Sequence, residues 1–348
     1  MIVLASIMPF ILSFLRVVFA FAFTALLVAP AHSQTLQTVK DRGHLICGAS
    51  EQLLGFAQQS SEGFWSGFDV DLCRAISAAI FGDPDKVEFI SYDGLARFAP
   101  LQLGDVDVLV RNASWNLRRD SLYQVRYVGT SFFDGQSFLI RKNLGIVSSY
   151  ELDELSICVI DASEEQSNLV EFSFKNQITY TEILYQDRHD LAIAYEGGLC
   201  DAISASSSHL YSMMRNMSEP DEHQILPERI SKQPLGPVIK LGDDEWYNLI
   251  NWVLFALVNG EELGVNSTGA TSFDVSKNPA IRRLLGLDAD FGKALGLEKE
   301  WAKNVISSVG NYKEIYERSF GSQTGLALPR GQNALWTNGG LLFAPPIR

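Results

Sequence analysis

The feature that most constrains this chain is an alternation of strand-like and helix-like segments. Short apolar runs at 44–48, 86–92 and 106–111 are typical of buried strands, and segments at 68–81 and 95–103 between them have helical character. Parallel strands need a long crossover between them, usually a helix, so the order β-α-β-α-β predicts a doubly wound, mostly parallel sheet.

The same alternation of strands and helices begins again after a predicted strand at 138–142. Strands are predicted at 155–160, 179–184 and 201–205, with helices at 163–175 and 188–197 between them. Extended segments near 136–142 and 231–242 predict two passages between the sheets. We therefore expect an α/β protein with two lobes, and a ligand cleft at the carboxyl ends of the strands.

The length of 348 residues suits two lobes of ordinary size. We assign 34–136 to the first lobe and 137–236 to the second. Residues 237–348 are expected to return to the first lobe and to form a C-terminal helical extension. A helix predicted at 243–263 begins this last part, because three acidic residues at its start favour the positive end of the helix dipole.

The first 33 residues have the composition of a secretory signal peptide. Arg16 is their only charged residue, an apolar run follows it, and small residues at Ala31 and Ser33 predict cleavage before Gln34. An uncleaved membrane anchor is the alternative, because the apolar segment is long enough to cross a bilayer. Export to the periplasm is the prediction in either case.

Four cysteines, Cys47, Cys73, Cys158 and Cys200, remain after the leader. An even number in an exported protein indicates two disulfides. Their positions favour Cys47 with Cys73 and Cys158 with Cys200, because each pair then stays within one half of the chain. Buried free thiols remain an alternative. No C-x-x-C pair is present, so metal binding is disfavoured.

Charge and motifs narrow the class of protein. The formal net charge is −13, and this disfavours a nucleic-acid-binding protein because such proteins need a basic surface. The sequence contains no phosphate loop, no Gly-x-Ser-x-Gly elbow and no paired-histidine metal motif, so we expect neither a cofactor nor catalysis. The five histidines are scattered. His209 follows the strand at 201–205 and could face the cleft, but we expect a surface position on a helix.

Several motifs resemble the polar-amino-acid class of extracellular solute-binding proteins, which is family 3. They are 67–72 (GFDVDL), 101–109 (LQLGDVDVL) and 112–115 (NASW). Segment 230–237 (ISKQPLGP) and the tail around 333–336 (NALW) resemble the subgroup of general L-amino-acid-binding proteins. The ordered set spans nearly the whole mature chain, and the cysteines stand where that subgroup has them. The resemblance implies the type II periplasmic-binding-protein fold.

The resemblance also implies ligand-binding residues in the first lobe. Arg119 matches an arginine that binds the ligand α-carboxylate, a role that suits the planar fork of a guanidinium. Asn112 and Ser114 are expected to hydrogen-bond the same end of the ligand. Leu53 stands where several relatives have an aromatic platform, with Phe56 nearby. Arg111 either meets an acidic ligand side chain or balances neighbouring acids.

The second lobe departs from the family pattern. Relatives have an aspartate, which binds the ligand ammonium, where this chain has Ser206, and a Gly-Thr-Thr-like turn where it has Ala162, Ser163 and Glu164. A buried ammonium with only a neutral partner costs several kcal/mol. One hypothesis is that Glu164, Glu165 or Asp161 replaces the lost carboxylate. The other is a ligand without an α-amino group, which Ser206 would suit.

The expected function is that of the substrate-binding component of an amino-acid ABC transporter. Its partners would be a small-molecule ligand and the permease subunits in the inner membrane, and the protein would act as a monomer. The rivals are a binder of a related carboxylate, a paralogue that binds no ligand and acts by protein contact, and a dehydratase-like enzyme on the same fold.

Overall fold

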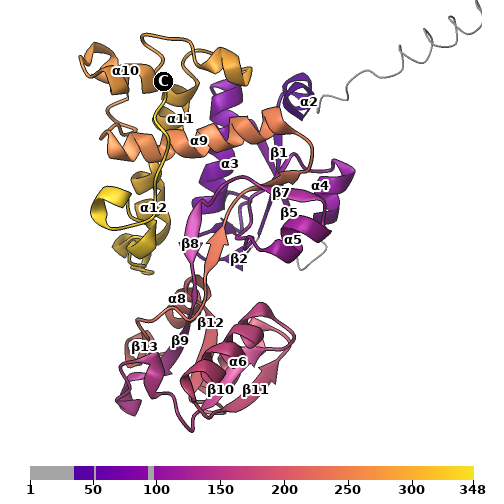
Figure 1. The fold of residues 1–348 in the computed structure, drawn as a ribbon, viewed down its shortest axis with the longest axis vertical. Coiled ribbons are helices and arrows are strands. Elements are labelled where there is room, and N and C mark those ends of the chain that lie inside the picture. Colours follow the sequence, from indigo (N-terminus) through magenta and orange to yellow (C-terminus); the bar gives the residue numbers. More distant parts are fainter. Residues whose placement is uncertain (1–34, 51, 93–97, 271) are drawn as a thin grey trace, which may run out of the picture. The chain divides into compact units, whose positions relative to one another are not determined.

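The computed structural model describes residues 35–50, 52–92, 98–270 and 272–348. The expected leader lies outside the described residues, as does the first part of the helix predicted at 95–103. Within the described part of the chain, no helix combines the length and the apolar character needed to span a membrane. The overall α/β character agrees with the prediction (Figure 1).

The first large sheet contains the strands predicted in the first repeat. Its strand order is β5-β1-β6-β15-β7, with β5, β1 and β6 parallel and β15 antiparallel to both of its neighbours. The strands are β1 (Leu45–Ala49), β5 (Val87–Ser91), β6 (Val108–Leu109), β7 (Val125–Tyr127) and β15 (Val238–Lys240). Three short strands form a separate small sheet: β2 (Gln52–Leu53), β3 (Ala57–Gln59) and β4 (Trp65–Ser66).

The second large sheet repeats this arrangement with the order β11-β10-β12-β9-β13. Strands β11, β10 and β12 are parallel, and β9 runs antiparallel to both β12 and β13. The strands are β9 (Gln136–Arg141), β10 (Ser156–Ile160), β11 (Thr181–Tyr185), β12 (Ala202–Ser206) and β13 (His223–Ile225). Both sheets therefore present the carboxyl ends of three parallel strands, where ligands bind in such folds.

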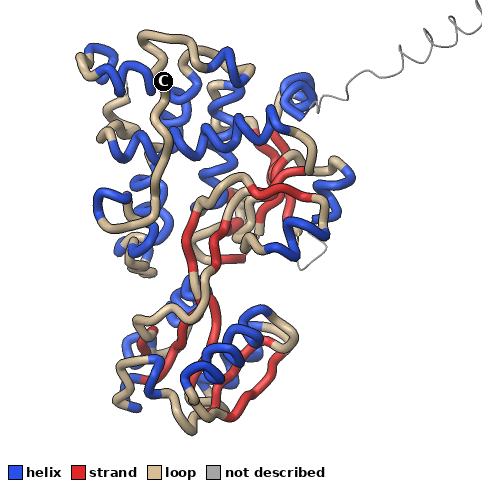
Figure 2. Tube along the Cα trace, viewed as in Figure 1, coloured by secondary structure: helices blue, strands red, loops and turns tan. Residues whose placement is uncertain are grey.

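Helices cover the sheets and form the C-terminal part of the chain (Figure 2). The helices are α2 (Thr35–Arg42), α3 (Phe68–Phe81), α4 (Ala99–Leu103), α5 (Leu117–Leu122), α6 (Glu164–Asn176), α7 (Arg188–Glu196), α8 (Ser207–Arg215), α9 (Asp244–Glu262), α10 (Pro279–Leu284), α11 (Trp301–Val309) and α12 (Tyr312–Phe320). Between and after these elements, short 3₁₀ helices occur at Lys142–Leu144, Ser149–Glu151, Pro220–Glu222, Ser272–Val275, Gly292–Leu295, Ser322–Thr324, Gly331–Asn333 and Trp336–Asn338. Helix α3 coincides with its prediction, and α6 begins one residue later because Ser163 is its N-cap.

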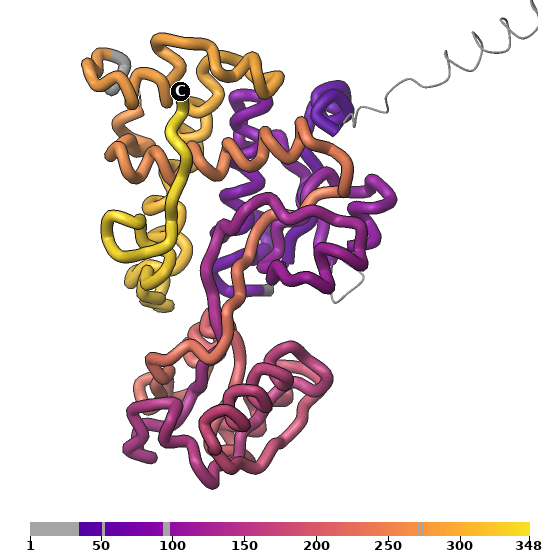
Figure 3. Tube along the Cα trace, viewed as in Figure 1, coloured from indigo at the N-terminus to yellow at the C-terminus, as the bar shows by residue number. Residues whose placement is uncertain are grey.

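Two short strands carry the chain between the sheets. Strand β8 (Phe132–Asp134) pairs antiparallel with β14 (Gln233–Leu235), and Figure 3 shows these two distant parts of the sequence side by side. The first passage was predicted near 136–142, but those residues form β9 inside the second sheet. Gly135 fits this junction because a Cβ there would lie 2.7 Å from the carbonyl oxygen of Ser231.

The C-terminal extension packs on the first lobe and contacts β8. Helices α11 and α12 pack against α3 and α9. The side chain of Asn333 accepts a hydrogen bond from Phe133 N at 2.7 Å and donates one to Phe133 O at 3.0 Å. Tyr312, fully buried, donates to Ser131 O at 2.7 Å. The extension thus supports the strand at which the chain leaves the first lobe.

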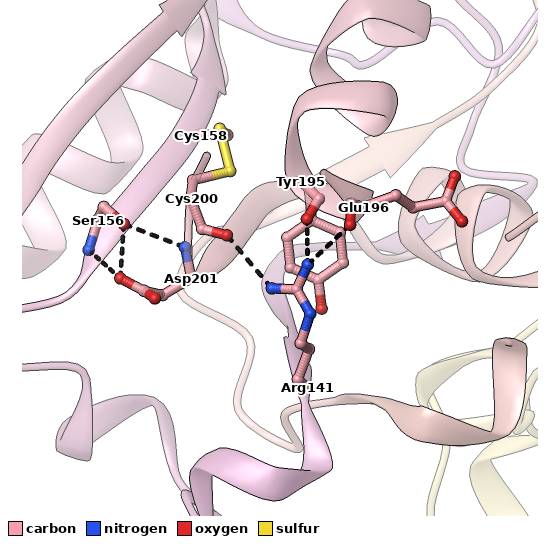
Figure 4. Close-up of a disulfide and its surroundings, with 7 residues drawn as sticks. All are labelled: Arg141, Ser156, Cys158, Tyr195, Glu196, Cys200 and Asp201. Atoms are coloured by element: carbon pink, nitrogen blue, oxygen red, sulfur yellow. Dashed lines mark hydrogen bonds between the residues drawn. A yellow bond between two sulfur atoms is a disulfide. The ribbon is translucent and has the colours of Figure 1, made fainter. Parts of the chain in front are cut away.

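Both disulfides join the cysteines that the sequence pairs, Cys47 with Cys73 and Cys158 with Cys200. In the second lobe, Arg141 donates to the carbonyl oxygens of Tyr195, Glu196 and Cys200 (Figure 4). An arginine at the C-terminal end of α7 satisfies carbonyls that the helix leaves unpaired and favours the helix dipole. The arginine on β9 thus ties the end of α7 to the sheet, and the disulfide joins β10 to the segment that leads from α7 into β12.

Candidate functional site

A cavity of about 530 Å³ lies at the strand ends of both large sheets. Such a volume is within the range of ~300–1,000 Å³ that ligand pockets occupy. The residues around it come from both lobes and from β14. They are Ser50, Leu53, Arg111, Asn112, Ser114, Arg118, Arg119, Tyr123, Ala162, Ser163, Glu164, Glu165, Arg188, Ser206, His209 and Gln233.

Arg119 is fixed by its own segment of the chain. Asn116 is the N-cap of α5, and its Oδ1 accepts a hydrogen bond from Arg119 N at 2.9 Å. Arg119 Nη1 donates to Ser114 O at 2.9 Å, and Tyr127 Oη donates to the same carbonyl at 2.8 Å. The side chain is 14% exposed, so the guanidinium is held in place yet still reaches the cavity.

Asn112 occupies an unusual backbone conformation beside Arg111. Its φ is 48°, a left-handed value that asparagine tolerates better than most residues. Its backbone N–H donates to Asp69 Oδ2 at 2.8 Å, and its side-chain Nδ2 is buried without a protein partner. Burial raises the pKa of Asp69 to about 7, against the opposing effects of this hydrogen bond and of Arg111. The Asp69 side chain therefore holds the backbone at Asn112, which lines the cavity.

Glu165 brings a carboxylate to Ser206, the position at which the sequence resemblance implied an aspartate in relatives. Its Oε1 accepts hydrogen bonds from Ser206 N and Ser206 Oγ, each at 3.0 Å. Arg188 Nη2 lies 2.9 Å from Oε1 and 3.0 Å from Oε2. Burial opposes ionisation of Glu165, but the charge of Arg188 and these hydrogen bonds lower its pKa overall. A carboxylate thus lies next to the serine, supplied by α6 rather than by β12.

Glu164 faces the first lobe instead. Its Oε1 accepts a hydrogen bond from Asn116 Nδ2 at 2.7 Å and lies 3.3 Å from Arg119 Nη2. The side chain is 47% exposed. Ser163 caps α6 by accepting from Gln166 N at 3.1 Å, and Ala162 before it has a φ of 51°, a value better suited to glycine. Glu164 therefore bridges the lobes at the arginine expected to bind the ligand carboxylate.

His209 lies in the cavity wall, so its expected surface position is wrong. Helix α8 begins at Ser207, directly after β12, and this places His209 over the strand end. Burial and the positive charge of Arg188 lower the pKa of His209 to about 3, so the imidazole is neutral near pH 7. Its Nδ1 is buried without a protein hydrogen-bond partner.

Two other expectations also need correction. Phe56 does not line the cavity: it is fully buried and packs edge-on against Phe132 and Phe320, with ring centroids 5.0 and 4.8 Å away. Leu53 is the residue that provides an apolar surface there. Asp161 is not a lining residue either, and its Oδ2 accepts a hydrogen bond from Gln186 Nε2 at 3.0 Å.

Sequence reasoning missed several lining residues. Ser50 and Arg188 follow the parallel strands β1 and β11, so the rule that ligands bind at carboxyl ends of strands could have found them. Gln233 lies on β14, Tyr123 ends α5, and Arg118 precedes the predicted anchor. No simple sequence signal distinguishes these three from ordinary polar surface residues.

The cavity differs in charge from the protein around it. Among the described residues, four arginines and two glutamates line it, whereas the whole chain carries a formal charge of −13. Within the described residues, no group of three His, Cys, Asp or Glu side chains is placed to hold a metal ion. Two α/β lobes, two connecting strands and a charged cavity at the strand ends define a solute-binding protein.

The chain belongs to the bacterial extracellular solute-binding proteins, family 3, whose sequence profile matches residues 45–265. It is therefore a substrate-binding protein of this family.

Similar proteins extend the match beyond the profile. The general L-amino acid-binding periplasmic protein AapJ of Rhizobium johnstonii is 41% identical over 91% of this chain and 94% of its own length. The glutamate/glutamine/aspartate/asparagine-binding protein BztA of Rhodobacter capsulatus is 42% identical over 94% of this chain and 97% of its own. A periplasmic binding protein from Brucella ovis, solved with glutathione bound, is 42% identical with a TM-score of 0.85; the match covers 91% of this chain and all of that one.

Proposed function

We propose that this protein captures an L-amino acid, or a small molecule built on one, for an ABC importer. The observation that carries the proposal is that a cation and an anion from opposite lobes line one cavity: Arg119 from the first and Glu165 from the second. An amino acid offers a carboxylate to a guanidinium and an ammonium to a carboxylate, and both pairings are charge-assisted hydrogen bonds.

The surroundings of each anchor support this orientation. Asn112 Nδ2, buried without a protein partner, can donate to the same carboxylate as Arg119. Oε2 of Glu165 accepts a hydrogen bond from Arg188 alone among the described residues, so it retains capacity for an ammonium. The ligands in the names of the AapJ and BztA relatives and the glutathione in the Brucella structure all contain an α-amino acid group.

The mechanism would be binding, closure and delivery. The lobes, with the boundaries assigned from the sequence, rotate about β8 and β14. The ligand bridges both lobes only in the closed form, and this difference in affinity shifts the population towards closure. Residues 1–33 would direct export, and the closed monomer would dock on permease subunits in the inner membrane. ATP is hydrolysed by other subunits of the importer.

A thermal-shift screen tests the proposal. The purified protein is heated with each common L-amino acid, with the matching keto acids and with reduced glutathione at equal concentrations. A ligand that binds only the native state adds about 2.7 kcal/mol of stability at one hundred times its dissociation constant. Stabilisation by compounds with an α-amino group is expected. No stabilisation by any of them would contradict the proposal.

One observation favours a second candidate function. Arg188 pairs with Glu165 and neutralises part of its charge, so the cavity could serve a carboxylate that lacks an amino group. In that case keto acids would stabilise the protein in the same screen, and the matching amino acids would not. The discriminating result is the ratio of affinities for an amino acid and its own keto acid.

A further inference from the structure

We propose that the second lobe carries a separate acid-binding subsite at Arg188, so the preferred ligand has two carboxylates as well as an amino group. This inference rests on the proposed function, because it assumes that Arg119 holds the α-carboxylate. The chemical class is an acidic amino acid or a peptide that contains one. Nothing about Arg188 was expected from the sequence, yet it lines the cavity opposite Arg119.

The hydrogen-bond pattern of Arg188 supports the subsite. Its Nη2 bonds to Glu165, whereas its Nη1 is buried without a hydrogen-bond partner among the described residues. A buried donor without a partner costs ~1–3 kcal/mol, so such a group in a native protein calls for an acceptor such as a ligand or an ordered water. The side chain is 35% exposed, so the guanidinium borders the cavity rather than lying sealed in the core. An incoming carboxylate would provide the missing acceptor.

The charge balance around the cavity points in the same direction. Both lining glutamates are already paired with arginines, Glu164 with Arg119 and Glu165 with Arg188. Arg118 is a further cationic side chain among the described lining residues, and His209 is neutral because its pKa is lowered to about 3. Arginines thus outnumber glutamates among the described lining residues, and this favours a ligand with net negative charge over a neutral zwitterion.

The first turn of α6 sets the separation of the two anion sites. Glu164 and Glu165 are neighbours in sequence, yet Glu164 binds Arg119 of the first lobe and Glu165 binds Arg188 of the second. The two guanidinium groups therefore flank one helical turn. A ligand that enters beside this turn can place one carboxylate on each arginine while its ammonium meets Glu165. Acidic amino acids and γ-glutamyl peptides both have this set of groups.

Isothermal titration calorimetry with acid and amide pairs tests the subsite. The probes are L-glutamate with L-glutamine, L-aspartate with L-asparagine, and reduced glutathione. In the unaltered protein, at least one two-carboxylate probe is expected to bind about tenfold or more tightly than the amides, as a hydrogen bond to a charged group implies. Whether glutathione or a free amino acid binds more tightly identifies the source of the second carboxylate.

Variants attribute the preference to Arg188. Arg188→Gln should bring the acid and amide affinities to within about twofold of each other, whereas Arg188→Lys should retain part of the preference. Arg282→Gln is the matched control, because Arg282 also pairs with a single acid, Asp288, but lies outside the cavity. Its acid preference should not change. Melting temperatures of all variants establish that they are folded.

The outcomes separate the two proposals. If amides bind the unaltered protein as tightly as acids do, or if Arg188→Gln keeps the acid preference, the subsite is wrong while the amino-acid function stands. If no probe binds and the wider thermal screen is also negative, the proposed function itself fails. A preference that Arg188→Gln removes and Arg188→Lys preserves supports both.

Discussion

The two sides of the cavity hold their charged groups in different ways. In the first lobe, Arg119 is fixed by Ser114 and Asn116, which lie five and three residues earlier in the chain. In the second, Glu165 is fixed by Arg188 and Ser206, which lie 23 and 41 residues later. The first anchor is thus part of one local turn, and the second is assembled from the ends of three strands.

This difference suggests how the site can change. A local turn keeps its arginine whatever happens elsewhere, so it suits a group that every amino acid shares. An assembled cluster can exchange one residue for another at a different position and keep a carboxylate in nearly the same place. By the sequence resemblance, Ser206 is expected to stand where relatives have an aspartate, and Glu165 of the neighbouring helix places a carboxylate beside it.

The largest effect should come from the first lobe. Arg119→Gln removes the guanidinium that the proposal assigns to the ligand carboxylate, so affinity should fall by about 100-fold or more for every ligand. Calorimetry measures the change. Arg126→Gln is the control, because Arg126 pairs with Asp244 outside the cavity. Equal affinities for the two variants would show that Arg119 is not the anchor.

A smaller effect of opposite sign is expected at Glu164. Its carboxylate lies 3.3 Å from Arg119 and so competes with the ligand for this arginine. An exposed ion pair contributes ~0.2–1 kcal/mol, so Glu164→Gln should tighten ligand binding by roughly 1.5- to 5-fold. The dissociation constant at low ionic strength is the measurement. Weaker binding would instead mean that Glu164 contacts the ligand ammonium.

The smallest effects concern pH, and they should differ in sign between the lobes. The pKa of Asp69 is raised to about 7, so its protonated form adds stability at low pH that is lost as pH rises from about 4 to 7. The pKa of His209 is lowered to about 3, so its neutral form adds stability above pH 6.5 that is lost as pH falls towards 3.

The variants Asp69→Asn and His209→Gln each remove one of these contributions to the pH dependence of stability. Relative to the unaltered protein, the free energy of unfolding of Asp69→Asn should rise more steeply between pH 4 and 7, and that of His209→Gln less steeply. Urea unfolding at several pH values in this range measures both slopes. Parallel slopes for the two variants would show that neither group titrates as its burial implies.

The contrast between local and long-range contacts also explains which features of the protein could be predicted from the sequence. Helix α3 follows from local sequence signals, and both disulfide pairs follow from the positions of the cysteines within each half of the chain. The cavity position of Arg119 was implied by the family resemblance of its segment. Phe56 was misplaced because an aromatic residue beside a site and one in the core look alike in sequence. Arg188 was missed as a cavity residue, and for His209 the surface was preferred to the cleft, because their positions depend on packing between distant strand ends.

The central claim is that Glu165 replaces the carboxylate that Ser206 lacks, and moving the charge back tests it most directly. Glu165→Gln alone should weaken amino-acid binding by about tenfold or more, because a charged hydrogen bond is lost. Adding Ser206→Asp to this variant should recover most of the affinity, since the new carboxylate starts from the residue that Glu165 contacts. Amino-acid binding that is unchanged in Glu165→Gln, measured by calorimetry on a folded variant, would contradict the account.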